Sequence, residues 1–132
     1  MTIKRINPAG LYEPNRGIYT QVITASGGTQ IHIAGLVPWD KNKNLVGKDD
    51  MASQVKQILD NMDQALTAAG AGHGDVVRIN VYTIDVERYI REGAPVLITY
   101  FGAAKPTSTT VEVRRLVHPD WLVEIEATAI ID

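Results

Sequence analysis

The clearest hydrophobic pattern lies in the middle of the chain, where apolar residues recur at the three- and four-residue spacing of an α-helix. Asp49 or Asp50 can cap the start of this helix, and Gly70 can end it. The pattern therefore predicts an amphipathic helix between these residues. Its buried stripe consists of Met51, Val55, Ile58, Leu59, Met62, Leu66 and Ala69.

Alternating apolar and polar residues, typical of half-buried β-strands, occur on both sides of this helix. Residues 17–24 are rich in β-branched and aromatic side chains, and residues 29–34 alternate with Ile31 and Ile33 on one face. The sequence Ser26-Gly27-Gly28 between them favours a tight turn, so the two stretches predict a β-hairpin. Three further strands are predicted at residues 76–84, 108–116 and 122–131.

Residues 86–101 again show helical spacing, with Gly93 and Pro95 interrupting it. Proline is tolerated in the first turn of a helix but not in its interior. The sequence therefore predicts a short helical turn, then a break, then a helix that starts near Pro95 and ends at Gly102.

The predicted order is β-β-α-β-α-β-β, an α+β or α/β fold that forms one domain over residues 1–132. Two helices cover at most one face of a sheet of about five or six strands. The other face must meet water or another subunit, so we expect the chain to oligomerise. That face should carry Gln30, His32, Arg78, Asn80, Glu124, Glu126 and Thr128, together with Tyr82 and Leu122.

Composition excludes several classes of partner. A formal net charge of −2 provides no basic surface for a phosphate backbone, so we expect no nucleic acid partner. No apolar run is long enough to span a membrane, and the first residues are too polar for a signal peptide, so we expect a cytoplasmic protein. The chain has no cysteine, which removes thiol nucleophiles and zinc–thiolate sites.

Most polar residues in the predicted elements have an ordinary structural explanation. His32, His73 and His118 are far apart and lack the i, i+4 spacing of a helical metal pair, so we expect no metal site. The hydroxyls at 107–110 have no nucleophile elbow and no evident base. They are therefore better explained as residues of a strand.

Glu124 and Glu126 are different, because two carboxylates on one face of an apolar strand cost free energy if they are buried without partners. One interpretation is that they are solvated or paired with Arg78. The other is that one of them transfers protons in a cleft between subunits. Spacing alone leaves both open.

Two stretches give the chain a family resemblance. Residues 105–113 (Lys-Pro-Thr-Ser-Thr-Thr-Val-Glu-Val) and 122–129 (Leu-Val-Glu-Ile-Glu-Ala-Thr-Ala) resemble the signature of the RidA/YjgF family, the reactive-intermediate deaminases also called endoribonuclease L-PSP. Tyr19, the segment 34–38 and the helix at 54–70 agree in place. The resemblance implies an α+β, chorismate-mutase-like fold with two helices on one face of a mixed sheet. It also implies a homotrimer with three clefts between subunits.

The resemblance also implies roles for individual residues. In active deaminases of the family, a glutamate aligned with Glu124 positions or activates the water that attacks the imine carbon. The residues aligned with Tyr19, Gly35 and Thr110 line the same pocket, Gly35 through its amide and Thr110 through its carbonyl. An arginine two residues after the conserved proline grips the substrate carboxylate bidentately.

The sequence departs from this pattern at three positions. Ser108 stands where the arginine is expected, Ala34 replaces a serine, and Gly93 falls near a common asparagine. Losing a desolvated, charge-assisted contact forfeits about 2 to 5 kcal/mol. The chain therefore resembles a branch of the family that lacks this arginine, and we expect it to be a poor 2-iminopropanoate deaminase.

Two functions remain, both without a cofactor. The first, which we favour, is hydrolytic deamination of a small enamine, imine or related metabolite, with Glu124 acting on water and Ser108 and Thr107 hydrogen-bonding a less anionic substrate. The second is a trimer that binds or senses a small molecule without catalysis. The ribonuclease activity in the family's other name is disfavoured by the acidic charge balance.

Overall fold

Helix α1 has the burial that its hydrophobic pattern predicts. In the computed structural model, which describes residues 1–132, α1 spans Met51–Ala68 and all but the last residue of its predicted stripe are buried. The Asp50 side chain caps it by accepting a hydrogen bond from the Ser53 amide at 3.0 Å. Gly70 follows at φ +77°, a conformation that side chains disfavour, so the helix stops there.

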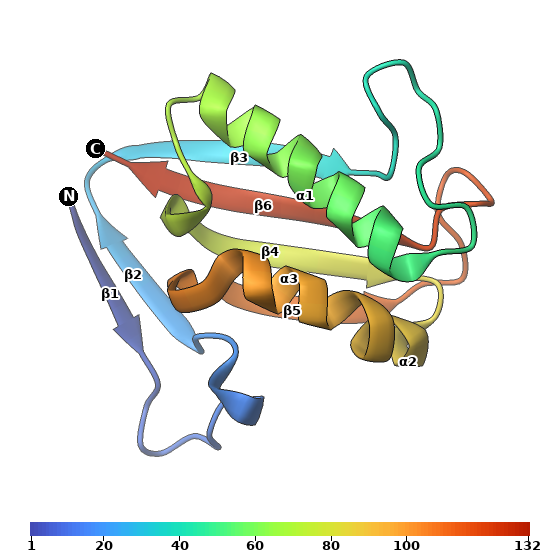
Figure 1. Ribbon diagram of the computed structural model, residues 1–132. Coiled ribbons are helices and arrows are strands. Elements are labelled where there is room, and N and C mark those ends of the chain that lie inside the picture. Colours follow the sequence, from blue (N-terminus) through green and yellow to red (C-terminus); the bar gives the residue numbers. More distant parts are fainter.

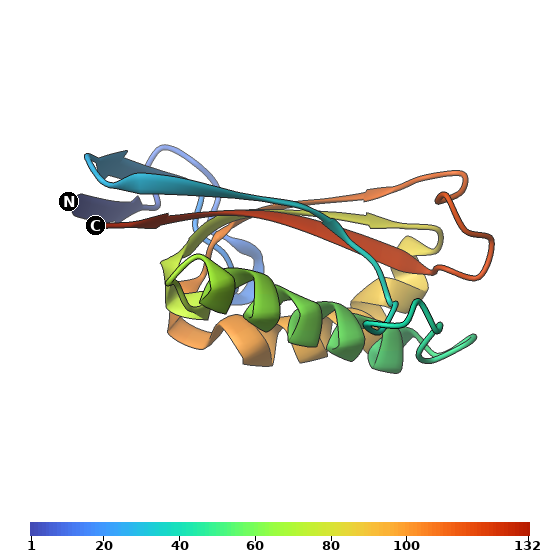
Figure 2. The same ribbon diagram turned by 90° about the horizontal axis from the view of Figure 1, so that it is seen from above.

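The main sheet has four strands in the order β3 (Thr29–Leu36), β6 (Val123–Ile131), β4 (Val76–Thr83) and β5 (Thr107–Glu112). The β4 and β5 strands are parallel and the other pairs are antiparallel, so the sheet is mixed. The helices pack on one face of this sheet and leave the other uncovered (Figures 1 and 2). The expected α+β architecture, with helices on one face, is confirmed.

Strand β6 shows how the sequence divides the two faces. Val123, Ile125, Ala127 and Ala129 are buried under the helices, whereas Glu124, Glu126 and Thr128 point to the open face and are partly exposed. Leu122 was expected among the polar residues, and this is wrong. It precedes β6 and is buried in the hydrophobic core, with only 8% of its surface exposed.

The predicted hairpin between residues 17–24 and 29–34 is also wrong. Strand β2 (Val22–Ser26) pairs with β1 (Thr2–Ile6), a strand that the sequence pattern did not reveal because four of its five residues are exposed. Strand β3 pairs instead with β6. Gly27 and Gly28, both at positive φ, carry the chain from the two-stranded sheet to the main sheet.

Residues 15–21, which include the predicted start of that strand, form a turn instead. A 3-10 turn spans Asn15–Gly17, and strand β2 begins only at Val22. The Thr20 hydroxyl donates a hydrogen bond of 2.6 Å to the Lys105 carbonyl, so this segment is bound to the chain before β5 rather than to a strand partner.

The second helical region is continuous where the sequence predicted a break. It consists of α2 (Val86–Arg88), a π-helical turn (Tyr89–Gly93) and α3 (Ala94–Phe101). Pro95 lies in the first turn of α3, and the wider π turn lets the helical backbone continue past it. Gly93 is needed here, because a Cβ atom at this position would lie 3.0 Å from Val55 of α1.

Strand β5 is shorter than predicted. It ends at Glu112 rather than at 116, because its neighbour β4 ends at Thr83 and leaves the chain beyond it without a partner strand.

No helix in the structure is long and apolar enough to cross a membrane.

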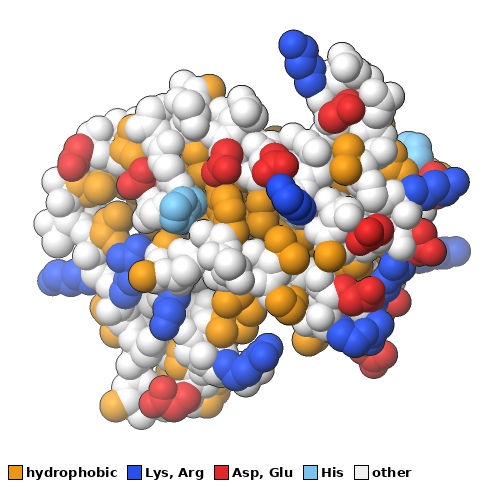
Figure 3. All heavy atoms as spheres, viewed as in Figure 1, with side chains coloured by type: hydrophobic (Ala, Val, Ile, Leu, Met, Phe, Trp, Pro, Cys, Tyr) orange, Lys and Arg blue, Asp and Glu red, His pale blue; other side chains and the backbone are white.

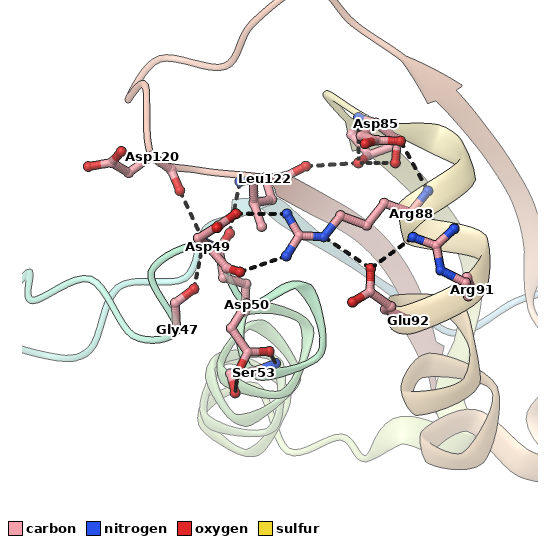
Figure 4. Close-up of polar contacts among 12 residues, drawn as sticks. Gly47, Asp49, Asp50, Ser53, Asp85, Arg88, Arg91, Glu92, Asp120 and Leu122 are labelled. Carbon is pink, nitrogen blue, oxygen red and sulfur yellow. Dashed lines mark hydrogen bonds and ion pairs between the residues drawn. The ribbon is translucent and has the colours of Figure 1, made fainter.

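Arg88 joins the start of α1 to α2 (Figure 4). Its guanidinium donates to the Asp49 carboxylate at 2.9 Å, to the Asp49 carbonyl at 2.6 Å and to Glu92 at 3.0 Å. Asp49 has a left-handed backbone with φ +53°. The bonds therefore hold a strained residue beside the helix cap and fix the two helices relative to each other.

Candidate functional site

Glu124 lies directly over Gly35, on the open side of the sheet. A Cβ atom at position 35 would lie 2.8 Å from Glu124 Cδ and closer still to Oε2, so any larger residue would displace the carboxylate. The β3–β6 register shifts between Ile33 and Leu36, which places Gly35 in a β-bulge opposite the start of β6. Bulges of this kind are common beside active sites because they redirect the backbone.

The surroundings of Glu124 favour the protonated form of its carboxyl group. Partial burial raises the pKa of Glu124 above its ordinary value of 4.5, and the nearby negative charge of Glu126 raises it further. Glu124, Glu126 and Arg78 form no ion pairs. The interpretation that Arg78 pairs with a glutamate is therefore wrong within one chain. The charge of Glu124 is left available to a bound molecule or a second copy of the chain.

Glu126 is engaged by its neighbours, in contrast to Glu124. It accepts hydrogen bonds from the Asn80 amide at 3.2 Å and from the Tyr82 hydroxyl. The hydrogen bond to Glu126 raises the pKa of Tyr82, with burial adding to the effect. Of the two carboxylates that the sequence singled out, Glu124 is the one free to handle a proton.

Three other candidate residues line a separate cavity of about 300 Å³ on the helix-covered side of the sheet. These are Tyr19, Ser108 and Thr110. Ser108 and Thr110 are in register with Ile79 and Val81 of the parallel strand β4, so their side chains point toward the helices. Most of the remaining wall is apolar and comes from the second helical region, including Tyr89, Leu97 and Phe101.

Contacts from the beginning of the chain bring Tyr19 beside Ser108. Arg5 donates from Nε to the Ala104 carbonyl at 2.9 Å, and Thr20 donates to the Lys105 carbonyl. Both acceptors lie just before β5. The segment that carries Tyr19 is therefore fixed against the strand that carries Ser108, although about ninety residues separate them in sequence.

Thr107 points away from this cavity. Its hydroxyl donates a hydrogen bond of 2.8 Å to the Val77 carbonyl, and it lines a hollow with Gln21, Val22 and Arg78. The candidate residues thus form two main groups within one chain: Gly35 with Glu124 on one face, and Tyr19, Ser108 and Thr110 on the other. The sheet lies between them, so one copy of the chain cannot bring both groups to one small molecule.

The structure adds Arg16 to the cavity, a residue that the sequence analysis did not select. It is the only one of the fifteen lining residues that carries a full charge at neutral pH. Its backbone lies in the left-handed region, at φ +53° and ψ +16°. The turn-forming run Pro14-Asn15-Arg16-Gly17 was the available signal, but sequence could not show that this turn packs beside β5.

The largest hollow in the structure, about 680 Å³, is bordered by Gly35 but contains neither Glu124 nor any residue of the second group. It lies between the end of β3, the following loop and α1, and seven of its ten lining residues are polar or glycine. No group of three or more histidine, aspartate or glutamate side chains lies close enough together to hold a metal ion. The chemical candidates therefore remain Glu124 on the open face and the 300 Å³ cavity.

Comparison with known proteins covers nearly the whole chain. Residues 12–131 match the family described as Endoribonuclease L-PSP. A RutC family protein of Pyrococcus horikoshii is 39% identical over 113 residues, which is 86% of each chain. The crystal structure of a protein of unknown function from the Rid family of Yersinia pestis matches with a TM-score of 0.87 and 34% identity, over 99% of this chain and 100% of that one.

A second solved structure agrees. It is a member of the YjgF/YER057c/UK114 family from Mycobacterium tuberculosis, 31% identical, with a TM-score of 0.69 over 98% of this chain and 100% of that one. These likenesses confirm the fold that the sequence resemblance implied.

Proposed function

The chain belongs to the endoribonuclease L-PSP family, the RidA/YjgF family whose members deaminate reactive imines and enamines, and on that premise we propose that it hydrolyses a small imine or enamine at a cleft between two copies of itself. The observation that carries this proposal is the position of Glu124. Its side chain lies against the backbone of Gly35, where no Cβ atom blocks it. The pKa of this carboxylate is raised, and it has no ion-pair partner.

In the proposed reaction, Glu124 removes a proton from a water molecule as the water oxygen attacks the electrophilic imine carbon. The C=N π electrons move to nitrogen, which takes up the proton that Glu124 removed, and a carbinolamine forms. The hydroxyl proton of the carbinolamine is then transferred to nitrogen, the C–N bond breaks and ammonia leaves. The carbon retains the oxygen as a carbonyl group. A raised pKa suits this role, because a base whose pKa is nearer the working pH transfers protons in both directions more readily.

Assembly into a homotrimer is part of the proposal. The open face of the sheet is polar and uncovered, and the two groups of candidate residues lie on opposite faces of it. A neighbouring copy can place its Glu124 and Gly35 at the mouth of the cavity that contains Tyr19, Ser108 and Thr110. Light scattering should then give three times the chain mass of 14.4 kDa, whereas a stable monomer would contradict the cleft.

With Ser108 in the cavity, we expect weak binding of a carboxylate attached to the reacting carbon. The Ser108 hydroxyl cannot form the two parallel hydrogen bonds by which a guanidinium holds a carboxylate. The chain should therefore release little ammonia from freshly generated 2-iminopropanoate, and Ser108→Arg should increase that rate at least tenfold. Ser108→Ala is the matched control and should leave the rate low. A wild-type rate equal to that of a relative bearing the arginine would contradict this account.

The second candidate function is a trimer that binds small molecules without catalysis, and the serine at position 108 favours it. A panel of imines and enamines, both neutral and carboxylate-bearing, separates the two functions. If the chain is an enzyme, Glu124→Gln should lower ammonia release at least 100-fold, while Glu87→Gln, which changes an exposed carboxylate without an ion pair, should not. Binding of small amides without turnover of any substrate would instead support the binding protein.

A further inference from the structure

The apolar cavity beside Ser108 contains a cation that comes from a different part of the chain. Arg16 lies in the 3-10 turn Asn15–Gly17 and lines the cavity together with Tyr19, Ser108 and Thr110. We infer that Arg16 binds an anionic group of the ligand from this turn and thereby selects a carboxylate with an apolar body. This inference rests on the proposed use of the cavity as the substrate-binding half of the cleft.

The donors of Arg16 are unoccupied within the chain. Its guanidinium makes no hydrogen bond and no ion pair, and its side chain is exposed. Arg88, by comparison, is fully engaged with Asp49 and Glu92. Arg78 and Arg114 also lack ion pairs, but neither lines this cavity. A guanidinium presents a planar fork of five donors that matches the two oxygens of a carboxylate.

The backbone supports a fixed position for this residue. A non-glycine residue at φ +53° is strained and persists only where its surroundings determine it. Here the turn is closed by the Gly17 amide, which donates to the Pro14 carbonyl at 2.9 Å, and by the Ile18 amide, which donates to Asn15 at 3.4 Å. Thr20 then binds the turn to the chain before β5.

The remaining wall of the cavity defines the rest of the ligand. Ten of its fifteen residues are hydrophobic, among them Ile18, Ile98 and Phe101. Tyr89 in this wall is buried and, as a tyrosine, is uncharged at neutral pH. Apolar side chains are also visible between the charged ones in the middle of the helix-covered face (Figure 3). Such a wall favours a hydrocarbon or aromatic body, with a single anionic group held by Arg16.

A ligand held in this way differs from 2-iminopropanoate. In that compound the carboxylate is attached to the reacting carbon and the apolar part is one methyl group. The guanidinium of Arg16 belongs to the turn Asn15–Gly17, whereas position 108 lies on β5. A carboxylate bound by Arg16 therefore need not be attached to the reacting carbon. The substrate class is therefore an imine or enamine with a larger apolar body and a carboxylate.

Binding of two isosteric probes tests the inference without relying on turnover. Isothermal titration calorimetry should show that wild type binds 3-phenylpropanoate about tenfold more tightly than 3-phenylpropanamide, because hydrogen bonds to a charged partner are roughly twice as strong as neutral ones. Arg16→Gln should abolish this preference without weakening the amide. Arg16→Lys should retain part of it, because lysine keeps the charge but not the planar fork.

Lys43→Gln is the matched control. Lys43 is an exposed cation that also has a left-handed backbone, with φ +62°, but it lies outside the cavity. This variant should keep the tenfold preference. A preference that survives Arg16→Gln would overturn the inference, and so would equal or undetectable binding of the two probes by wild type. Failure of every imine to react would count against the proposed hydrolysis but would leave this binding result unchanged.

Discussion

The two faces of the main sheet are built from the same strands but have opposite chemistry. On the helix-covered face, Val81 and Ile125 are at most 1% exposed and pack into the core. On the open face, the adjacent residues Tyr82, Glu124 and Glu126 are polar and partly exposed. Neighbouring residues of one strand are thus separated by the thickness of the sheet.

This difference places the hydrophobic core on one face and a carboxylate without an ion pair on the other. The hydrophobic core of seventeen buried residues lies entirely between the sheet and the helices. The open face keeps a carboxylate without an ion pair, which a stable core would not tolerate. In the proposed homotrimer, a ligand in the 300 Å³ cavity on the helix-covered side would meet the open face of another copy.

The largest effect should come from truncating the core at one position of β6. Ile125→Ala should lower the free energy of unfolding by about 3 kcal/mol, because it removes buried methyl and methylene groups and leaves a cavity. Thr128→Ala, on the open face of the same strand, should change it by less than about 0.5 kcal/mol. Urea denaturation at a fixed protein concentration measures both. Equal losses would show that the open face is also a packed core.

A smaller effect should follow from disturbing Glu124 without touching the core. In Gly35→Ala the new methyl group would displace the Glu124 carboxylate, so ammonia release should fall about 10- to 100-fold while the melting temperature changes little. Gly10→Ala is the matched control, because nothing lies within 4 Å of a Cβ atom there. Unchanged activity in Gly35→Ala would remove Glu124 from the proposed reaction.

The smallest effect is a dependence of stability on pH. Because the pKa of Glu124 is raised on folding, the folded chain retains this proton to higher pH than the unfolded chain, and ionising the group destabilises the fold. Glu124→Gln should therefore be more stable than wild type at pH 7, by less than about 1 kcal/mol because solvent screens the carboxylate.

This gain should disappear at pH values below the ordinary glutamate pKa of 4.5, where the carboxyl is protonated in both states. Denaturation of both proteins between pH 3 and 8 measures it. A gain that stayed constant over this range would show that the charge of Glu124 is not the cause.

Local patterns predicted the elements whose burial is periodic along the chain. Helix α1, with its Asp50 cap, and the alternation of β4 and β6 follow directly from residue spacing. The resemblance to the RidA/YjgF family selected Glu124 and Ser108 from short motifs. Strand β1 was not predicted because its exposed residues show no alternation of apolar and polar side chains. The pairing of β2 with β1 rather than β3 could not be predicted either, because it is a contact between distant parts of the chain.

The sequence by itself determined the helix-covered core, the polar residues of the opposite face and the serine at position 108, where the family resemblance leads us to expect an arginine. Only the tertiary structure decided that Glu124 lies over Gly35 and that Arg16 shares a cavity with Ser108. The physical reason is that periodicity reports which side of one element is buried. Contacts between residues about ninety positions apart depend instead on how turns, bulges and strand pairing bring the elements together.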